Sequence, residues 1–461
     1  MEALRDFPTA LSPMLVKELR QGMRTNMFTI AFILLQTFMV LCLLAGIGSP
    51  GCGGADAFFW FFIVSTLLVV QPLRGFSALS SEYQLNTMDL IQLTRLDAWR
   101  ITLGKWTALN AQSLLLITGV LPYLVMRYFL GNVNFVVDLL GLALISVGSG
   151  LTTAITIGCS VFKNFLLRGV LVIVFGIGTT ILFVGAMEVL DNRSIAKDEL
   201  LALGSAAVAG VYGIFFFLSF GASRISPLSE NLATRKRLAA ILAVLVTYSL
   251  YLFDAPEAIL AVSSVILALG VVDAITEPLP IFARVLQPFK KNFLLRLSAL
   301  FLCPGWIGGL GFFFLAIFLW LGAFGLAILS GENLLDRTRD WVAFFSGCNV
   351  LVFPLIIIHL FFRKLSQREF TFALYIFIQA CLFVVTLMVS AMAEAMSHYE
   401  EVIFASIPIP SVLLFASAEG ETDGLYFLLV SVCTTFLCII IPRLRNRSHV
   451  KEFLRELFSS E

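Results

Sequence analysis

Long runs of apolar residues constrain this chain more than any other feature of its sequence. A helix that crosses the hydrocarbon core of a bilayer needs about 20 predominantly apolar residues. Twelve runs of roughly this length occur, and the seventh is the shortest. They cover residues 27–48, 57–74, 110–130, 135–161, 167–188, 200–222, 238–253, 256–275, 304–329, 341–362, 370–393 and 425–442. The sequence therefore predicts an all-α, polytopic integral membrane protein with about 12 transmembrane helices.

The composition lies outside the range of soluble domains. Hydrophobic residues make up 59% of the chain and charged residues only 13%, whereas soluble domains carry about 25% charged residues. The 31 Lys and Arg nearly balance the 30 Asp and Glu, so no basic surface indicates a nucleic-acid partner. Eight Cys are scattered without metal-ligand spacing and only three His occur. We therefore expect neither a metal site nor a cofactor bound by this chain.

The distribution of basic residues predicts the topology. If the N-terminus is cytoplasmic, 26 of the Lys and Arg residues fall in cytoplasmic segments and five fall outside. Since cytoplasmic loops collect Lys and Arg, both termini are expected in the cytoplasm of a plasma (bacterial inner) membrane. The first apolar run follows 26 residues and is longer than a signal-peptide core, so no cleavable signal is expected. The stretch 402–416, which contains Pro408 and Pro410, is interpreted as a re-entrant or interfacial element on the outer side.

Polar segments divide the chain into five predicted parts. Two six-span membrane domains are separated by a polar cytoplasmic linker, and each end of the chain carries an amphipathic segment. The predicted parts are an interface helix (1–26), a first membrane domain (27–222) with a cytoplasmic segment (78–106), the linker (223–237), a second membrane domain (238–442) and the tail (443–461).

Both amphipathic segments show helical periodicity. Near the N-terminus, the basic residues Lys17, Arg20 and Arg24 lie opposite an apolar arc, and Glu18 is the exception at the apolar edge. Such a helix lies in the inner headgroup layer, where apolar burial and anionic lipid hold it. The arc comprises Leu11, Met14, Leu15, Leu19 and Met23, and the tail has a similar arc of Val450, Phe453, Leu454, Leu457 and Phe458.

The cytoplasmic segment from Ser80 to Trp106 has a different pattern. Its apolar residues do not share one helical face, which favours a short helical hairpin between the membrane domain and a cytoplasmic protein. A loop packed against its own neighbours is the alternative. The apolar residues are Leu85, Met88, Leu90, Ile91, Leu93 and Leu96.

This segment resembles the first cytoplasmic loop of type-2 ABC exporter permeases, whose pattern is roughly E-x-x-x-G-T-x-[DE]-x-L-x-x-T-P-L-x-x-x-x-I-x-x-G-K. The chain departs from the pattern at Asn86, where Gly is usual, and at Arg95, where Pro is usual. The N-terminal helix is also similar to the family's interface helix, so the resemblance covers residues 1 to about 222. The matching residues are Glu82, Thr87, Asp89, Leu90, Thr94, Leu96, Ile101, Gly104 and Lys105.

The resemblance implies an exporter driven by a separate cytoplasmic ABC ATPase that docks under this segment. ATP and Mg²⁺ would be bound by that partner, and the permease would form a homodimer or a heterodimer with a related permease. The chain lacks a G-x-x-x-x-G-K-[ST] phosphate loop, so we expect no ATP hydrolysis by the chain itself. The residues expected to couple the two proteins are Glu82, Thr87, Asp89, Leu90, Leu93, Thr94, Arg95, Gly104 and Lys105.

Two other functions remain open from the sequence. A secondary transporter would carry intramembrane acids that bind ions or protons, and the chain could also be a structural subunit of a larger complex. The acidic candidates all lie near the ends of predicted spans, where we expect them to be solvated, and His359 is expected at the inner interface. These acids are Asp138, Glu188, Asp273 and Glu394.

Overall fold

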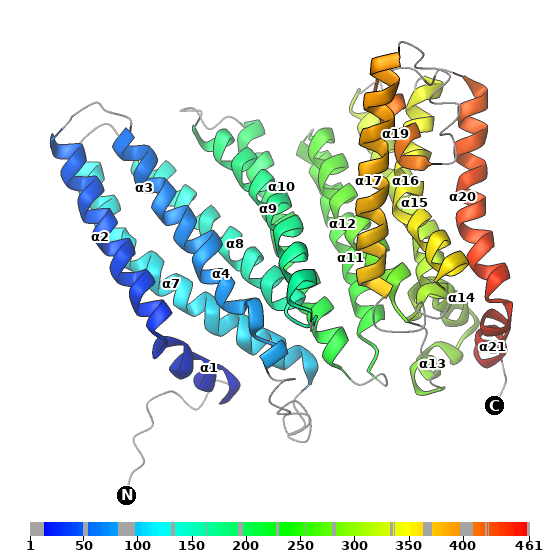
Figure 1. Ribbon diagram of the computed structural model, residues 1–461, viewed down its shortest axis with the longest axis horizontal. Helices are drawn as coiled ribbons and strands as arrows, with labels where there is room; N and C mark the ends of the chain where they lie inside the picture. The colour runs from blue at the N-terminus through cyan, green and yellow to red at the C-terminus, as the bar shows by residue number, and fades with distance from the viewer. Residues whose placement is uncertain are drawn as a thin grey trace, which may run out of the picture. The chain divides into compact units, whose positions relative to one another are not determined.

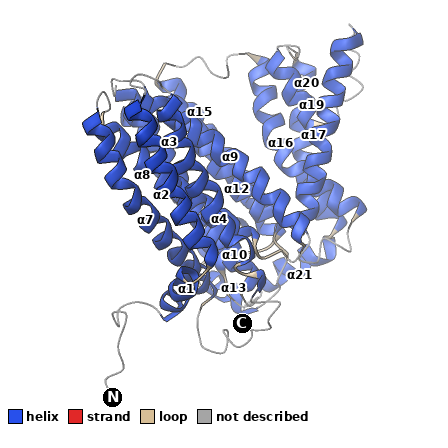
Figure 2. Cartoon of the chain, turned by 60° about the vertical axis from the view of Figure 1, so that its left-hand side comes forward, coloured by secondary structure: helices blue, strands red, loops and turns tan. Residues whose placement is uncertain are grey.

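The computed structural model is helical throughout its described part, in which no strand occurs (Figure 2). The predicted all-α class is therefore confirmed for these residues. The chain divides into two compact units, Met1–Ser226 and Pro227–Glu461, and each is described by itself. The described residues are 13–48, 54–81, 97–130, 134–162, 164–191, 197–226, 230–253, 255–278, 283–331, 335, 337–362, 371–396, 409–419, 422 and 424–458.

Ten helices of this part are long and apolar enough to cross a membrane, and they coincide with ten of the twelve predicted spans. The predicted span 167–188 lies in α9 (Phe165–Asp191), of which the stretch Phe165–Thr180 is apolar but short. The predicted span 238–253 is formed by the 17-residue helix α11 (Leu232–Tyr248) and the 3₁₀ turn η3 (Ser249–Phe253). A polytopic membrane architecture is thus confirmed, and the total of twelve spans stays a prediction.

In unit 1, the short helix α1 (Pro13–Met23) precedes a series of long helices and lies at the lower end of α2 in Figure 1. The second span is irregular because a π-helix and a 3₁₀ turn flank the short helix that contains Pro72, a residue without a backbone N–H. The elements are α1 (Pro13–Met23), α2 (Asn26–Gly48), α3 (Gly54–Val64), η1 (Ser65–Val70), α4 (Gln71–Leu73), η2 (Arg74–Ser77), α7 (Ala98–Leu130), α8 (Phe135–Cys159), α9 and α10 (Lys197–Ile225).

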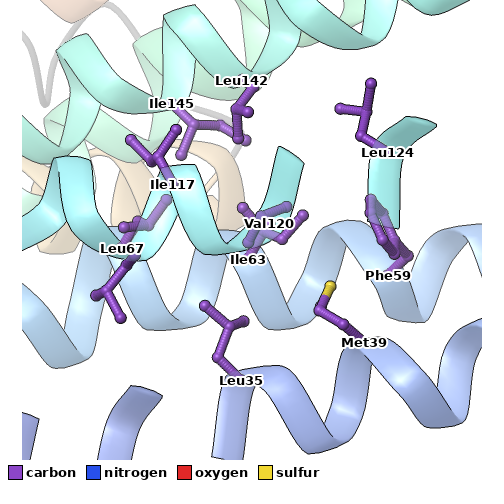
Figure 3. Packing of buried hydrophobic residues seen from close by; sticks show 11 residues of the cluster. Leu35, Met39, Phe59, Ile63, Leu67, Ile117, Val120, Leu124, Leu142 and Ile145 are labelled. Carbon is purple, nitrogen blue, oxygen red and sulfur yellow. The ribbon is translucent and has the colours of Figure 1, made fainter. Parts of the chain in front are cut away.

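The core of unit 1 lies where α2, the second span, α7 and α8 meet (Figure 3). Its members recur at helical spacing, as Phe59, Ile63 and Leu67 do on the second span, so each helix presents one buried stripe. Other faces of the same helices expose large apolar side chains such as Ile33 and Leu44, as expected of surfaces solvated by lipid. The buried set is Leu35, Met39, Phe59, Ile63, Leu67, Leu116, Ile117, Val120, Leu124, Leu142 and Ile145.

In unit 2, three short helices gather at one end of the long ones (Figure 1). These are α13 (Ala283–Lys290), α14 (Phe293–Leu302) and α21 (Arg447–Phe458). α13 contacts both α14 and α21, and Phe453 and Leu457 of α21 are buried. The apolar arc of the tail is therefore partly covered by protein. The other elements are α11, η3, α12 (Pro256–Thr276), α15 (Trp306–Leu329), α16 (Thr338–Phe361), α17 (Thr371–Met396), α19 (Pro410–Glu419) and α20 (Leu425–Arg445).

Two polar segments differ from their predicted form. Residues 98–106 of the cytoplasmic segment are the first turns of α7, one continuous helix of 33 residues. The predicted linker 223–237 is largely helical, because α10 extends to Ile225 and α11 begins at Leu232. Of the predicted element 402–416, residues 402–408 lie outside the described part. Residues 410–416 belong to α19, which has ten residues and packs against α16 and α17.

Candidate functional site: the coupling segment and its clamp

Most of the predicted coupling residues lie outside the described residues. These are Glu82, Thr87, Asp89, Leu90, Leu93, Thr94 and Arg95. The structure does describe both ends of their segment. The described part of the chain stops at Ser81, after the second span, and resumes at Asp97, directly before α7.

An ion pair joins the beginning of α7 to the N-terminal helix α1. Lys105 Nζ lies 3.0 Å from Glu18 Oε1, and the two side chains are only 5% and 19% exposed. Glu18, the exception in the amphipathic pattern, is thus explained by a partner 87 residues away. The Lys105 ammonium group thus faces Glu18 inside the protein. It fastens the helix that leaves the coupling segment, and its neighbour Gly104 lies buried in the same helix.

Arg74 makes a second connection, from the end of the second span to α1. One guanidinium nitrogen donates to the Gly22 carbonyl (2.8 Å) and to Thr25 Oγ1 (3.0 Å). The other donates to the side-chain oxygens of Gln71 (3.3 Å) and Gln112. Since Gln112 belongs to α7, Arg74 links three elements. The backbone of α1 comes so close that a Cβ at Gly22 would lie 2.1 Å from Gln112 Nε2.

The outer face of α1 remains available to the membrane surface. Lys17, Arg20 and Arg24 are exposed, while Leu15 and Leu19 are half-buried. The helix therefore presents the basic face expected of an element that meets anionic headgroups. Its side chains before Leu15 lie outside the described residues.

The end of the second span is also fixed on its other side. Arg168 of α9 is buried and donates to the carbonyls of Phe76 (2.9 Å) and Phe162 (3.0 Å). The Leu79 amide donates to Ser160 Oγ at 3.1 Å. The entrance to the coupling segment is thus attached to α1, α7, α8 and α9. We call the contacts of Glu18, Lys105 and Arg74 the coupling clamp.

Unit 2 contains a buried charge cluster that the sequence analysis did not predict. Lys236 Nζ lies 2.5 Å from Asp273 Oδ2 and 2.8 Å from Glu277 Oε1. Arg237 Nη2 lies 3.0 Å from Glu277 Oε2. All four side chains are between 3% and 12% exposed. Two positive and two negative charges therefore compensate one another inside the protein.

The expectation that Asp273 is solvated is consequently wrong, and Lys236 and Arg237, at the end of the predicted linker 223–237, are buried. Burial by itself raises the pKa of the Glu277 carboxyl. The charges of Lys236 and Arg237 and the Gly305 amide outweigh burial and hold this pKa below its ordinary value. A signal was present in the sequence: three adjacent bases, Arg235 to Arg237, lie in the first turns of α11, and two acids spaced i, i+4 stand at the end of the next helix.

Two further polar residues are buried rather than solvated. Asp138 pairs with Arg127 at 3.3 Å, and the Arg127 guanidinium lies 4.9 Å from the centre of the Phe59 ring. His359 is 2% exposed and lies within hydrogen-bond distance of Asn446, 2.9 Å between Nδ1 and Nδ2. The expectation that Asp138 is solvated is therefore wrong, whereas the interfacial position of His359 stays a prediction.

No group of three or more His, Cys, Asp or Glu residues that could hold a metal ion occurs within the part of the chain that the structure describes. Comparison with known proteins yields no match among family models, curated proteins or solved structures. The function must therefore be inferred from the chain's own residues.

Proposed function

We propose that this protein is the membrane-spanning permease subunit of an ABC exporter, with ATP hydrolysed by a separate cytoplasmic ATPase. The observation that carries the proposal is the coupling clamp. Arg74 lies before residues 82–96 of the coupling segment and Lys105 lies after them, and each is fastened to α1. A force applied between them therefore acts on the interface helix and two spans together.

Helix α7 is suited to transmit such a force. It begins one residue after Asp97 and continues without interruption for 33 residues, about 50 Å at 1.5 Å per residue. This exceeds the hydrocarbon thickness of about 30 Å. A tilt imposed on its first turn, in which Arg100 is exposed while Ala98 and Ile101 are buried, would thus be carried along α7 toward the opposite side of the membrane.

We assign ATP hydrolysis to a partner protein because this chain has no G-x-x-x-x-G-K-[ST] phosphate loop of its own. Within the coupling segment, Glu82 and Asp89 are proposed to contact basic groups of that ATPase, and Leu90 and Leu93 to supply apolar contact. Exposed ion pairs contribute about 0.2–1 kcal/mol each. Reversing both acids adds repulsion and should weaken association much more than removing one of them.

The test is association of the purified full chain with a candidate ABC ATPase, sought first among the neighbouring genes, together with stimulated ATP turnover. The Glu82→Lys, Asp89→Lys variant should lose both. A matched reversal of two acids on α21, Glu452→Lys and Glu456→Lys, should retain them. Full association and turnover in the first variant would refute the assignment of this segment as the coupling element.

The stoichiometry provides an independent test. Two ATPase subunits act together in such transporters, and we identify one coupling segment per chain. Mass photometry of the solubilised complex should show two permease chains with two ATPases. A complex with one permease chain would mean that unit 2 supplies the second docking surface.

A secondary transporter is the second candidate, and the charge cluster of unit 2 favours it. Buried acids in membrane proteins commonly bind protons or ions, and Asp273 and Glu277 are such acids. Transport by the purified chain in proteoliposomes, driven by a proton gradient without an ATPase, would support this function. Transport only with the ATPase and ATP would support the exporter.

A further inference from the structure

Helix α14 lies at one end of a membrane span. Only three residues, Cys303 to Gly305, separate it from α15, which is one of the candidate spans. Three residues bridge at most about 14 Å, so α14 must lie close to the boundary of the bilayer. Under the predicted topology, this boundary belongs to the cytoplasmic leaflet.

The C-terminal end of α14 is held in place by α11. Arg237 Nη1 donates to the carbonyls of Phe301 (3.1 Å) and Cys303, and Thr234 Oγ1 donates to the Leu302 carbonyl at 2.9 Å. These carbonyls end a helix and have no partner within it. Because the charge cluster anchors Arg237 in turn, the orientation of α14 relative to α15 is fixed.

The face of α14 that points away from the protein is apolar and exposed. Phe293 and Leu294 are 75% and 77% exposed, and Leu297 is also exposed, while Ala299 on the inner face is fully buried. Three basic residues stand beside the apolar face. Lys291 is exposed, Lys290 and Arg296 are half-buried, and Arg296 Nε donates to the Lys290 carbonyl at 3.2 Å.

We propose that α14 binds acidic phospholipid at the inner surface of the membrane. Phe293, Leu294 and Leu297 insert among the acyl chains, and Lys290 and Lys291 attract the anionic headgroups. Apolar burial combined with positive charge is the chemistry by which amphipathic helices recognise such a surface. No Asp or Glu occurs between Ala283 and Leu302, so the charged side chains of this stretch are all basic. This proposal is independent of the exporter function.

The experiment uses the full chain with Phe293→Trp, reconstituted in mixed bilayers of phosphatidylcholine and phosphatidylglycerol in which one lipid or the other is brominated. Bromine quenches a tryptophan that reaches the acyl chains, and the parent chain supplies the background of its own six Trp. The new Trp should be quenched by both lipids, and more strongly by phosphatidylglycerol. Adding Lys290→Gln and Lys291→Gln should lower this preference by about fivefold for each lysine.

Two controls make the result specific. Lys290→Arg with Lys291→Arg keeps both charges and should keep the preference. Phe318→Trp places the probe at another exposed position in α15, where no lipid preference is expected. Leu294→Trp repeats the measurement if the Phe293 variant folds poorly. Absence of quenching at both positions 293 and 294, or equal quenching by the two lipids, would overturn the proposal.

Discussion

Replacing Lys236 by Met should destabilise unit 2 strongly, although Met preserves most of the apolar side chain. The variant leaves Asp273 and Glu277 buried with only the Arg237 guanidinium to compensate them. Removing one partner of a buried pair costs about 3–5 kcal/mol, because a charge remains without compensation. At roughly 2–4 °C per kcal/mol for a unit of this size, the melting temperature should fall by about 6–20 °C.

The double variant Lys236→Met, Asp273→Leu should be more stable than either single variant. It removes one charge of each sign and leaves the Arg237–Glu277 pair, whose nitrogen and oxygen lie 3.0 Å apart, neutral as a whole. Replacing a buried pair by apolar residues of similar size is often neutral. We therefore expect the double variant within about 1 kcal/mol of the parent.

The assay is thermal unfolding of the purified full chain in lipid nanodiscs, followed by tryptophan fluorescence. Arg339→Met is the matched control, because its pair with Asp340 spans 3.6 Å and is 35% exposed. Its removal should change stability by less than about 1 kcal/mol. Losses in the double variant that equal the sum of the two single losses would refute the reasoning, since independent sites add and compensating charges do not.

Three further predictions follow from local geometry and from the charge distribution. Gly311→Ala should lower the melting temperature, because the added Cβ would lie 1.9 Å from the Leu300 carbonyl oxygen. Gly325→Ala in the same helix is the control: its Cβ would have no other atom within 4 Å, so it should be neutral or stabilising by up to about 1 kcal/mol. Acidification should destabilise the parent chain more steeply than the Glu277→Gln variant. Because the pKa of the Glu277 carboxyl is lowered by folding, its contribution to stability is complete above the unfolded pKa of about 4.3 and is lost as the pH falls through the folded value. Equal slopes of melting temperature against pH for the two chains would contradict this. A cysteine introduced after Ser448 should resist membrane-impermeant maleimide in intact cells, and labelling from outside would refute the topology.

The positions of the long helices could be predicted because the signal is local. In a bilayer, each backbone N–H and C=O group must be hydrogen-bonded within the protein. A helix satisfies these groups within one segment, so a sufficiently long apolar run forms a helix. Ten predicted runs accordingly coincide with apolar helices of spanning length. The N-terminal amphipathic pattern likewise marks the position of α1 (Pro13–Met23).

The sequence by itself determined where the long apolar helices lie, and it placed charged residues at their ends. Only the tertiary structure decided whether those charges are solvated or buried. Glu18 and Lys105 are 87 residues apart, and Lys236 and Glu277 are 41 apart. Hydropathy is a sum over neighbouring residues. The environment of a charge at a helix end depends instead on which other helix packs against it, and that packing is determined by contacts between segments distant in the chain.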